Sequence, residues 1–238
     1  MRQSTKPTSA GARRFVAAID VDTGARRTRV RRLRGLYAVT PDNDDTTTLI
    51  AQVAAALEGG AAAIQYRNKS ASEALREAQA FALARLHAAR GGLLIVNDDA
   101  ALAAKVGADG VHIGSEDGSV ASARALIGPD RIVGVSCYDD FDCARRAVEA
   151  GADYVAFGSF FLSSTKPGAR RAPLALLEEA RSLDVPIVAI GGIDADNART
   201  LVDAGADAVA MISAIFKSTD AQSIRDATRL IASRISLR

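Results

Sequence analysis

Short apolar segments alternate with helix-like segments along most of this chain. From about residue 36 onward, eight apolar runs of four or five residues are each followed by a stretch with apolar residues at helical spacing. Short continuous apolar runs are typical of parallel strands that are buried on both faces. The expected strands are residues 36–40, 62–66, 93–96, 110–113, 132–135, 154–157, 186–190 and 208–211.

Eight strand–helix units favour one α/β architecture, the (β/α)₈ TIM barrel. Residues 35–238 hold all eight units, which is the compact end of the range of such barrels, roughly 200 residues and upward. A doubly wound open sheet is the alternative. The expected helices are residues 46–58, 71–90, 99–106, 119–127, 140–150, 173–183, 194–204 and 219–235.

A Gly-Ala-Asp tripeptide occurs three times, each time between the end of a helix and the next strand. The copies end at Asp109, Asp153 and Asp207. The glycine permits a left-handed stop of the helix. Because these aspartates precede strands, they belong to the N-terminal face of the barrel, where repeated features serve stability. We therefore interpret the three carboxylates as structural.

The N-terminal segment differs in charge from the rest of the chain. Residues 1–34 hold nine arginines and one lysine against two aspartates, a net charge of +8, so the remaining residues carry −6. We expect residues 1–34 to be a basic, disordered or loosely attached extension, and residues 35–238 to be the barrel domain. The extension has few aromatic residues and no recognisable module, so a nucleic-acid partner is not expected.

Composition excludes several classes of protein. No apolar run approaches the roughly 18 residues needed to span a membrane. Cys137 and Cys143 are the only cysteines, and their spacing matches neither a disulfide framework nor a zinc site. We expect a cytoplasmic protein. The sequence does not determine the oligomeric state, and a homo-oligomer is compatible with it.

Positively charged side chains follow two of the expected strands. In a TIM barrel the chemistry lies at the C-terminal ends of the strands. After the second strand, alternation points Gln65, Arg67 and Lys69 the same way. After the sixth strand, residues 163–168 read Ser-Ser-Thr-Lys-Pro-Gly and contribute hydroxyls and Lys166. These groups suit a polyanion such as diphosphate.

Two carboxylates follow neighbouring strands. Asp98 comes after the third strand and Asp117 after the fourth. Carboxylates facing a basic pocket are explained if a metal ion lies between them, and Mg²⁺ takes one or two protein carboxylates together with water and phosphate oxygens. An N-cap role for Asp98 is compatible with metal binding.

The last two strands indicate a second, simpler anion site. Gly192 follows the seventh strand and Ser213 the eighth. Loops at these positions of a TIM barrel often bind a phosphate through backbone N–H groups. The strand ends therefore predict a Mg²⁺-bound diphosphate beside a monophosphate.

The chain has only two histidines, and neither is an evident base. His112 lies within the fourth strand, where we expect a barrel histidine with satisfied hydrogen bonds, and we expect His87 at the surface of a long helix. A reaction that releases diphosphate needs no protein nucleophile when the second substrate is itself nucleophilic. Stabilisation of the departing charge then carries most of the catalysis.

From residue 35 to about residue 216, the chain resembles the thiamine-phosphate synthases of the thiamine synthase/tautomerase barrel family. Each motif is weak alone, but their order and spacing are specific. The motifs that carry the resemblance are Gln65-Tyr66-Arg67-Asn68-Lys69, Val96-Asn97-Asp98, Gly107 to Gly114, Gly134-Val135-Ser136, Ser163-Ser164-Thr165-Lys166, Ala189 to Ile193, and Ile212-Ser213-Ala214-Ile215.

The resemblance implies a reaction and roles for individual residues. Hydroxymethylpyrimidine diphosphate would lose diphosphate, and the ring nitrogen of hydroxyethylthiazole phosphate would attack the resulting pyrimidine-methyl cation. The residues implied to bind the pyrimidine diphosphate, of which Arg67, Lys69, Ser136 and Lys166 would be catalytic, are Gln65, Arg67, Lys69, Asn97, Ser136 and Lys166. Asp98 and Asp117 would hold Mg²⁺. The residues implied to bind the thiazole phosphate are Ser163, Thr165, Gly192, Ile212 and Ser213.

Several positions depart from the family pattern, and two other functions are compatible with parts of it. Asn68 stands at a usual glutamate and Asp99 at a frequent arginine, so Asp99 and Glu116 are further candidates for metal binding. A thiazole tautomerase of the same family would rely on a histidine base where the chain has Cys137-Tyr138. A non-catalytic phosphate-ligand sensor is the other alternative.

Overall fold

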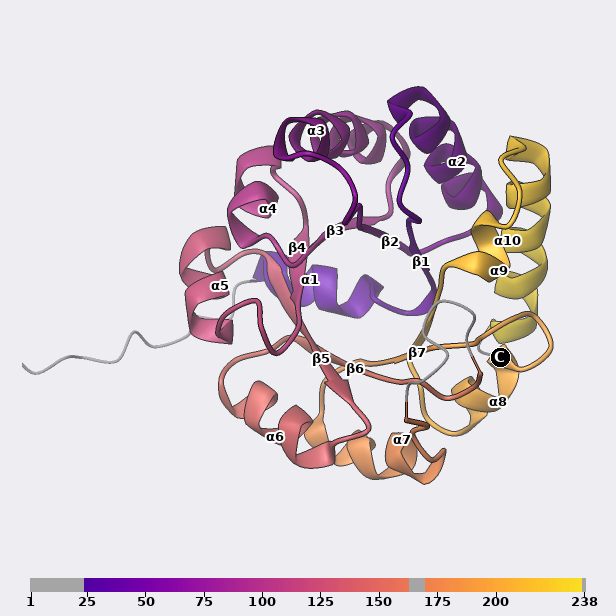
Figure 1. Cartoon of the computed structure of the whole chain (residues 1–238). Coiled ribbons are helices and arrows are strands. Elements are labelled where there is room, and N and C mark those ends of the chain that lie inside the picture. Colours follow the sequence, from indigo (N-terminus) through magenta and orange to yellow (C-terminus); the bar gives the residue numbers. More distant parts are fainter. Residues whose placement is uncertain (1–23, 163–169, 237–238) are drawn as a thin grey trace, which may run out of the picture.

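Eight parallel strands close into a barrel in the computed structural model, which describes residues 24–162 and 170–236 (Figure 1). Each strand pairs with its neighbours in chain order, and β1 pairs with β8 to complete the ring. The closed ring confirms the predicted barrel and excludes the open sheet. The strands are β1 (Gly35–Val39), β2 (Ala63–Tyr66), β3 (Leu93–Asn97), β4 (Gly110–Ile113), β5 (Ile132–Tyr138), β6 (Tyr154–Phe157), β7 (Ile187–Ile190) and β8 (Ala208–Met211).

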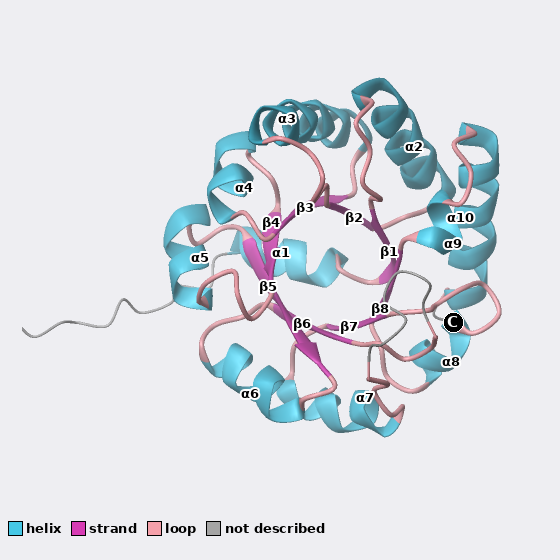
Figure 2. Cartoon of the chain, in the orientation of Figure 1, coloured by secondary structure: helices cyan, strands magenta, loops and turns pink. Residues whose placement is uncertain are grey.

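Helices surround the strands in an outer ring (Figure 2). All eight predicted helices are present, and the structure adds α1 before the barrel and α9 after β8. The helices are α1 (Gly24–Arg32), α2 (Thr46–Gly59), α3 (Glu73–Arg90), α4 (Ala100–Val106), α5 (Val120–Ile127), α6 (Phe141–Glu149), α7 (Ala175–Ala180), continued by the 3₁₀ turn η1 (Arg181–Leu183), α8 (Ala198–Asp203), α9 (Ser213–Phe216) and α10 (Ala221–Ile235). No helix in the described ranges has the length and apolarity to cross a bilayer.

Side-chain caps determine where most of these helices begin. Ser72 and Asp220 accept N–H groups of the first turns of α3 and α10, so both helices start later than the apolar pattern predicts. Helix α8 starts at Ala198 rather than near residue 194, because the Asp194 carboxylate accepts the N–H groups of Asp196 and Asn197 in a turn.

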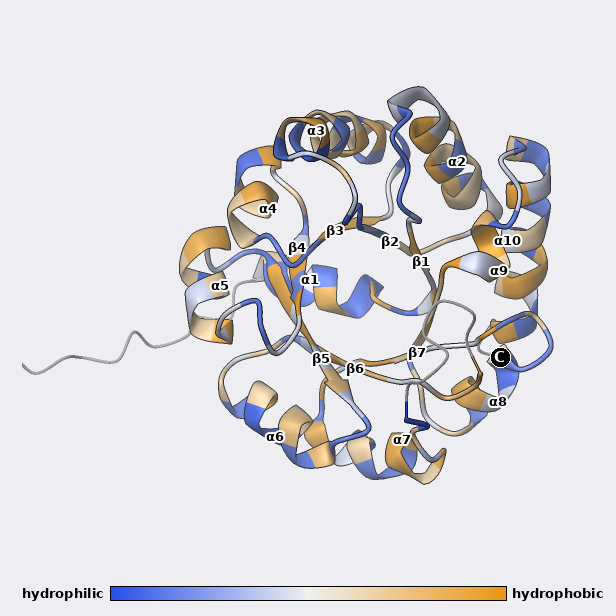
Figure 3. Cartoon of the chain, viewed as in Figure 1, coloured by the Kyte–Doolittle hydropathy of each residue, from blue (hydrophilic) through white to orange (hydrophobic). Residues whose placement is uncertain are grey.

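The apolar core has two layers, one inside the barrel and one between the strands and the helices (Figure 3). Alternation along each strand separates them: Tyr37 and Val39 of β1 face the interior layer, whereas Leu36 and Ala38 face the helices. Both faces of every strand are therefore covered, which explains the continuous apolar runs in the sequence.

The three repeated aspartates stabilise the N-terminal ends of the strands, as predicted. In each copy the carboxylate accepts a backbone N–H from the start of the preceding strand: Asp109 from Leu94 at 3.0 Å, Asp153 from Val133 at 2.7 Å and Asp207 from Ile187 at 3.0 Å. The repeat thus ties neighbouring strands together at the end of the barrel away from the expected chemistry.

The prediction of a loosely attached extension over residues 1–34 is wrong for its last eleven residues. Helix α1 lies across one end of the barrel, in the centre of the ring of strands in Figure 1. Its Arg29 pairs with Asp109 at 2.8 Å, and its buried Arg26 lies 3.5 Å from Asp153. The remaining carboxylate of the repeat, Asp207, pairs with Arg34 at 3.2 Å. Residues 1–23 lie outside the described residues.

An apolar contact adds to this polar docking. Leu33 is 1% exposed and belongs to the interior layer, with Val30 packed against it. The positive charges of α1 meet the negative charges that the repeat places at the same end of the barrel. The arginines of α1 and the aspartates of the repeat are far apart along the chain. Their complementary charges come together only when the barrel has folded.

We predict that Leu33→Ala lowers the free energy of unfolding by about 2–5 kcal/mol, the usual cost of truncating a buried leucine. Arg32→Ala is the matched control on the exposed side of the same helix end and should change stability by less than about 0.5 kcal/mol. Urea denaturation of both variants checks this. Equal stabilities of the two variants would mean that α1 does not contribute to the core.

Candidate functional site

The C-terminal end of the barrel opens into a cavity of about 520 Å³. Its lining includes ten of the residues that the sequence analysis selected, from the ends of six strands. These residues are Gln65, Arg67, Lys69, Asn97, Asp98, Asp117, Ser136, Gly192, Ile212 and Ser213. The other three selected residues, Ser163, Thr165 and Lys166, lie outside the described residues.

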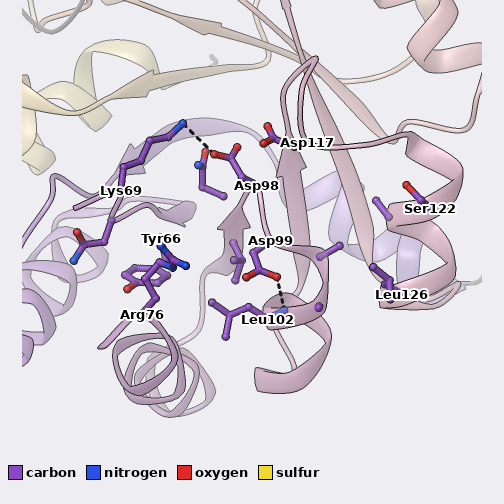
Figure 4. Close-up of a pocket in the computed structure, with 15 residues that line it drawn as sticks. Tyr66, Lys69, Arg76, Asp98, Asp99, Leu102, Asp117, Ser122 and Leu126 are labelled. Carbon is purple, nitrogen blue, oxygen red and sulfur yellow. Dashed lines mark hydrogen bonds and ion pairs between the residues drawn. The ribbon is translucent and has the colours of Figure 1, made fainter. Parts of the chain in front are cut away.

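A second cavity, of about 540 Å³, adjoins the first (Figure 4). The two share Lys69, Asn97, Asp98 and Asp117, so these residues form the wall between them. The far side of the second cavity is mainly apolar and carries Leu126, which is 56% exposed. The shared wall is the most highly charged part of either cavity.

One carboxylate organises the cations that follow β2. The Asp42 carboxylate accepts the Arg67 guanidinium at 3.0 Å and the backbone N–H of Lys69 at 2.8 Å. The Thr40 hydroxyl bridges the backbone N–H and carbonyl of Arg67 at 2.9 and 2.8 Å. These contacts hold the segment that carries both cations at the cavity wall.

The departure at Asn68 is accommodated by a buried amide network. Asn68 is 4% exposed, and its amide nitrogen donates to the Asn43 carbonyl at 2.7 Å and to Gln79 Oε1 at 3.0 Å. Gln79 also donates to the Asn43 carbonyl at 2.8 Å and accepts the Tyr66 hydroxyl at 2.8 Å. Asn68 therefore lies outside the lining of the first cavity, borders the second, and anchors the loop between Arg67 and Lys69. The sequence analysis missed this supporting role of Gln79.

Two carboxyl groups face each other in the shared wall (Figure 4). Asp98 Oδ2 pairs with the Lys69 ammonium at 3.1 Å. The pKa of Asp98 is raised, chiefly by burial and further by the nearby Asp117 carboxylate, while the Lys69 ammonium opposes the shift. Because the negative charge of Asp98 is disfavoured where it stands, an added cation would be stabilised between the two carboxylates.

The backbone at Asp98 is also under constraint. Its φ of 64° lies in the left-handed region, which residues other than glycine, asparagine and aspartate rarely adopt. Its N–H donates to the His112 carbonyl at 2.8 Å. Such conformations cluster at functional sites, where the surrounding structure holds them.

The neighbouring Asp99 has a different function. It is the N-cap of α4, and its Oδ1 accepts the backbone N–H of Leu102 at 2.8 Å, as drawn in Figure 4. Asp117 instead accepts the Gly114 N–H at 2.8 Å, which leaves its other oxygen for the cavity. Of the pair after β3, Asp98 faces the shared wall and Asp99 stabilises a helix.

A magnesium ion fits this donor set. Within residues 24–162 and 170–236, no group of three or more His, Cys, Asp or Glu side chains is arranged to hold a metal ion, and the donor set is the Asp98 and Asp117 pair. Two facing carboxylates are what Mg²⁺ uses when substrate phosphates and water complete its shell.

Glycine is required after β7 for packing as well as for any ligand. Gly192 has a φ of 67°, and a Cβ there would lie 2.4 Å from the Leu162 carbonyl oxygen. The loops after β6 and β7 therefore touch at this point. Ile212 and Ser213, at the start of the short helix α9, line the same cavity as Gly192.

A chain of buried hydrogen bonds runs beneath the cavity. His112 contacts Ser136 Oγ through Nε2 at 2.8 Å and the Tyr154 hydroxyl through Nδ1 at 2.9 Å. The Tyr154 and Tyr37 hydroxyls are 3.0 Å apart, and Gln65 Nε2 donates to Tyr37 at 3.0 Å. The prediction that His112 is a satisfied barrel histidine is confirmed.

Burial determines the protonation of this chain. It lowers the pKa of His112 to about 4, and it raises the pKa of Tyr37 and of Tyr154. All three groups are therefore neutral near pH 7. The sequence analysis missed both tyrosines; the available signal was that Tyr37 and Tyr154 occupy inward-facing positions of their strands.

The other histidine does not lie where it was expected. His87 is 7% exposed, and its Nδ1 lies 2.9 Å from the Leu83 carbonyl oxygen. The prediction of a surface position is wrong, because the last turn of α3 packs against the start of β3, where Gly92 approaches the imidazole. His87 lines neither cavity.

Comparison with known proteins shows which proteins this chain resembles. A family model described as thiamine monophosphate synthase matches residues 36–215. The chain is 55% identical over 190 residues to a thiamine-phosphate synthase of Azoarcus sp. (strain BH72), which covers 79% of this chain and 92% of that protein. It is 56% identical over 187 residues to a thiamine-phosphate synthase of Thiobacillus denitrificans (strain ATCC 25259 / T1), covering 78% and 89%.

A solved structure has the same barrel. The thiamine phosphate pyrophosphorylase from Pyrococcus furiosus superposes with a TM-score of 0.75 at 35% sequence identity, covering 87% of this chain and 97% of that chain.

The two aspartates after β3 should differ in their contribution to stability. We predict that Asp99→Ala lowers the free energy of unfolding by about 0.5–2 kcal/mol, the cost of losing an N-cap. The free energy of unfolding of Asp98→Asn should stay within about 1 kcal/mol of that of the parent. The substitution removes a disfavoured charge, keeps a residue type that tolerates positive φ, and loses one partly exposed ion pair. Urea denaturation compares them. A larger loss for Asp98→Asn than for Asp99→Ala would contradict these assignments.

Proposed function

Because this chain belongs to the thiamine monophosphate synthase family, we propose that its barrel joins 4-amino-2-methyl-5-hydroxymethylpyrimidine diphosphate to hydroxyethylthiazole phosphate. The enzyme is a transferase that forms thiamine phosphate and releases diphosphate. The observation that carries the substrate proposal is the convergence of ten selected residues, including two cations and two facing carboxylates, on one cavity. The cavity has a charged wall for a diphosphate and a glycine-containing wall for a monophosphate.

The bond changes need charge stabilisation rather than a protein nucleophile. The bond between the pyrimidine methylene carbon and the diphosphate oxygen breaks, and its electron pair leaves with the diphosphate. The lone pair of the thiazole nitrogen then forms the new carbon–nitrogen bond. No proton is transferred in this sequence. In the proposed dissociative path, a pyrimidine-methyl cation forms as the diphosphate departs, and the thiazole nitrogen then attacks this cation.

The described side chains support this path. The Cys137 thiol is buried, and burial raises its pKa, so it is a poor nucleophile. Both ring nitrogens of His112 are engaged in hydrogen bonds. By contrast, Arg67 and Lys69 are held at the cavity wall by Asp42, where their charges would stabilise the departing diphosphate.

Asp98 and Asp117 are the residues that would hold Mg²⁺. When bound, the ion supplies positive charge to the diphosphate oxygens. Asn97 lies beside Asp98 in the cavity lining and would donate to the diphosphate. Lys166, outside the described residues, would add a third cation.

The opposite wall would bind the thiazole phosphate. Gly192 and Ser213 follow the neighbouring strands β7 and β8 and offer a backbone N–H and a hydroxyl to the cavity, which Ile212 also lines. Ser163 and Thr165, outside the described residues, would add hydroxyls. Two phosphorylated substrates would then meet above Ser136 and Gln65, with their anions at opposite sides.

Product analysis tests the proposed reaction. Purified protein mixed with both substrates and MgCl₂ should form thiamine phosphate and diphosphate in equal amounts, and omission of either substrate or addition of EDTA should abolish both products. Folded protein that yields no thiamine phosphate with both substrates and Mg²⁺ would refute the proposal. A thiazole tautomerase or a phosphate sensor would give that negative result.

The metal assignment predicts a difference between adjacent aspartates. Asp98→Asn should raise the Mg²⁺ concentration that gives half-maximal rate at least tenfold, whereas Asp99→Ala should leave it within about twofold, because only Asp98 faces the shared wall. Initial rates over a MgCl₂ titration measure this. The reverse order would move the metal ligand to Asp99.

Lys166→Ala should raise the reaction barrier by roughly 2–4 kcal/mol, the range for losing one preorganised charge-stabilising donor. Single-turnover rates of the variant and its parent measure the change, with Lys217→Ala as a control for loss of one lysine elsewhere. An unchanged turnover would remove Lys166 from the diphosphate site.

A further inference from the structure

The hydrogen-bond chain inside the barrel joins two residues of the cavity that belong to nearly opposite strands. It begins at Gln65 on β2 and ends at Ser136 on β5, and it passes through Tyr37, Tyr154 and His112. Every link is between 2.8 and 3.0 Å. Both end residues line the cavity.

The orientation of the Gln65 amide sets the direction of the protons in this chain. Gln65 Nε2 donates to the Tyr37 oxygen, so the single proton of Tyr37 goes to Tyr154. The proton of Tyr154 then goes to His112 Nδ1. A neutral imidazole that accepts at Nδ1 carries its proton on Nε2, and this proton is donated to Ser136 Oγ.

The chain therefore leaves a hydroxyl donor and a carbonyl acceptor at the cavity, besides the second N–H of the Gln65 amide. Ser136 already accepts from His112, so its own proton is directed away from the imidazole. Gln65 uses its amide nitrogen inside the barrel, so its carbonyl oxygen is left as an acceptor. The cavity thus presents a donor at Ser136 and an acceptor at Gln65.

The surrounding structure is built to hold this arrangement. Tyr37 is 1% exposed and Tyr154 is fully buried, and the rings of Tyr154 and His112 stack with centroids 5.5 Å apart. A Cβ at Gly134 would lie 1.9 Å from Cζ of Tyr154, so a side chain at that strand position would displace the ring. This packing fixes the rings, and with them the positions of the hydroxyl oxygens.

We propose that Tyr37, Tyr154 and His112 are positioning residues that hold Ser136 as a donor and Gln65 as an acceptor toward the aminopyrimidine. The inference rests on the proposed function, because the aminopyrimidine is one of its two substrates. An aminopyrimidine offers an amino group that donates and ring nitrogens that accept, which is the complement of the two cavity groups. An analogue with an oxo group in place of the amino group reverses part of that pattern and would leave buried groups unpaired.

The position of the imidazole proton is the first test, and it does not depend on activity. The chain has only two histidines, so ¹⁵N-histidine labelling gives two sets of ring signals, and His87→Gln assigns them. At pH 7.5 the His112 signals should report the Nε2–H tautomer. In Tyr154→Phe, which removes the donor to Nδ1, they should report a mixture of tautomers. A single Nδ1–H tautomer in the parent protein would overturn the proposed direction.

The second test uses kinetics and a matched pair of histidine substitutions. His112→Gln can place an amide N–H near the position of Nε2, whereas His112→Asn is too short to reach Ser136. We expect kcat of His112→Gln to remain within about threefold of the parent, and kcat of His112→Asn and Tyr154→Phe to fall about tenfold or more. KM for the thiazole phosphate should not change. Equal losses for the glutamine and asparagine variants would contradict positioning through Nε2.

A double-mutant cycle separates positioning from a general structural role. Because His112 is the residue of the chain that contacts Ser136, the Ser136→Ala, His112→Asn double variant should be no slower than Ser136→Ala alone, within about twofold. Losses that multiply would overturn the proposal. Thermal unfolding of each variant reports whether it folds, and Tyr154→Phe keeps the ring that fills the interior.

The outcomes distinguish this inference from the function on which it rests. Absence of product from the parent enzyme refutes the proposed function. Normal activity of the parent together with an unaffected Ser136→Ala refutes the role of Ser136. A slow Ser136→Ala with fully active His112→Asn and Tyr154→Phe refutes only the positioning chain.

Discussion

Closure of a parallel barrel puts every strand between two apolar layers, and the rest of this structure follows from that constraint. A polar group inside the barrel must find a partner inside the barrel, because no water-facing side exists for it. Tyr37, Tyr154 and His112 meet this requirement by bonding to one another and to Gln65 and Ser136, and Tyr37 and His112 also line the cavity. The same requirement that stabilises the interior therefore fixes how two cavity residues present their hydrogen-bonding groups.

Closure also separates stability from chemistry along the barrel axis. At the N-terminal end, the carboxylates of the three Gly-Ala-Asp copies bond to strand N–H groups, and three arginines of the N-terminal segment pair with them. At the C-terminal end, the Asp98 and Asp117 carboxylates lie near each other, and the one ammonium group of Lys69 does not neutralise both of them. Asp98 has a raised pKa and a left-handed backbone, neither of which favours folding by itself. The disfavoured charge lies where a cation and an anionic substrate would relieve it.

Much of the fold could be predicted, because it depends on local periodicity. The eight strands and eight of the helices follow from apolar spacing, and the role of the repeated aspartates follows from their place before strands. Helix α1 could not be predicted in this way. Helix α1 has no apolar face that would mark it as a helix in the sequence. Its Arg26 and Arg29 meet their partners, Asp153 and Asp109, only at the end of the folded barrel. Helix α8 begins a few residues after the position that apolar spacing predicts, because the Asp194 side chain forms a turn with the N–H groups of Asp196 and Asn197. Apolar spacing carries no information about such a turn.

The sequence by itself determined the barrel, the family and the set of residues at the strand ends, since all three are written in order and spacing along the chain. Only the tertiary structure decided how these residues divide their tasks. It assigned Asp99 to a helix cap and Asp98 to the shared wall, tied Asn68 into a buried amide network, and linked Ser136 to Gln65 through residues more than a hundred positions apart. The physical reason is that a hydrogen bond depends on where two atoms lie in space and on which of them is the donor. Spacing along a chain records neither.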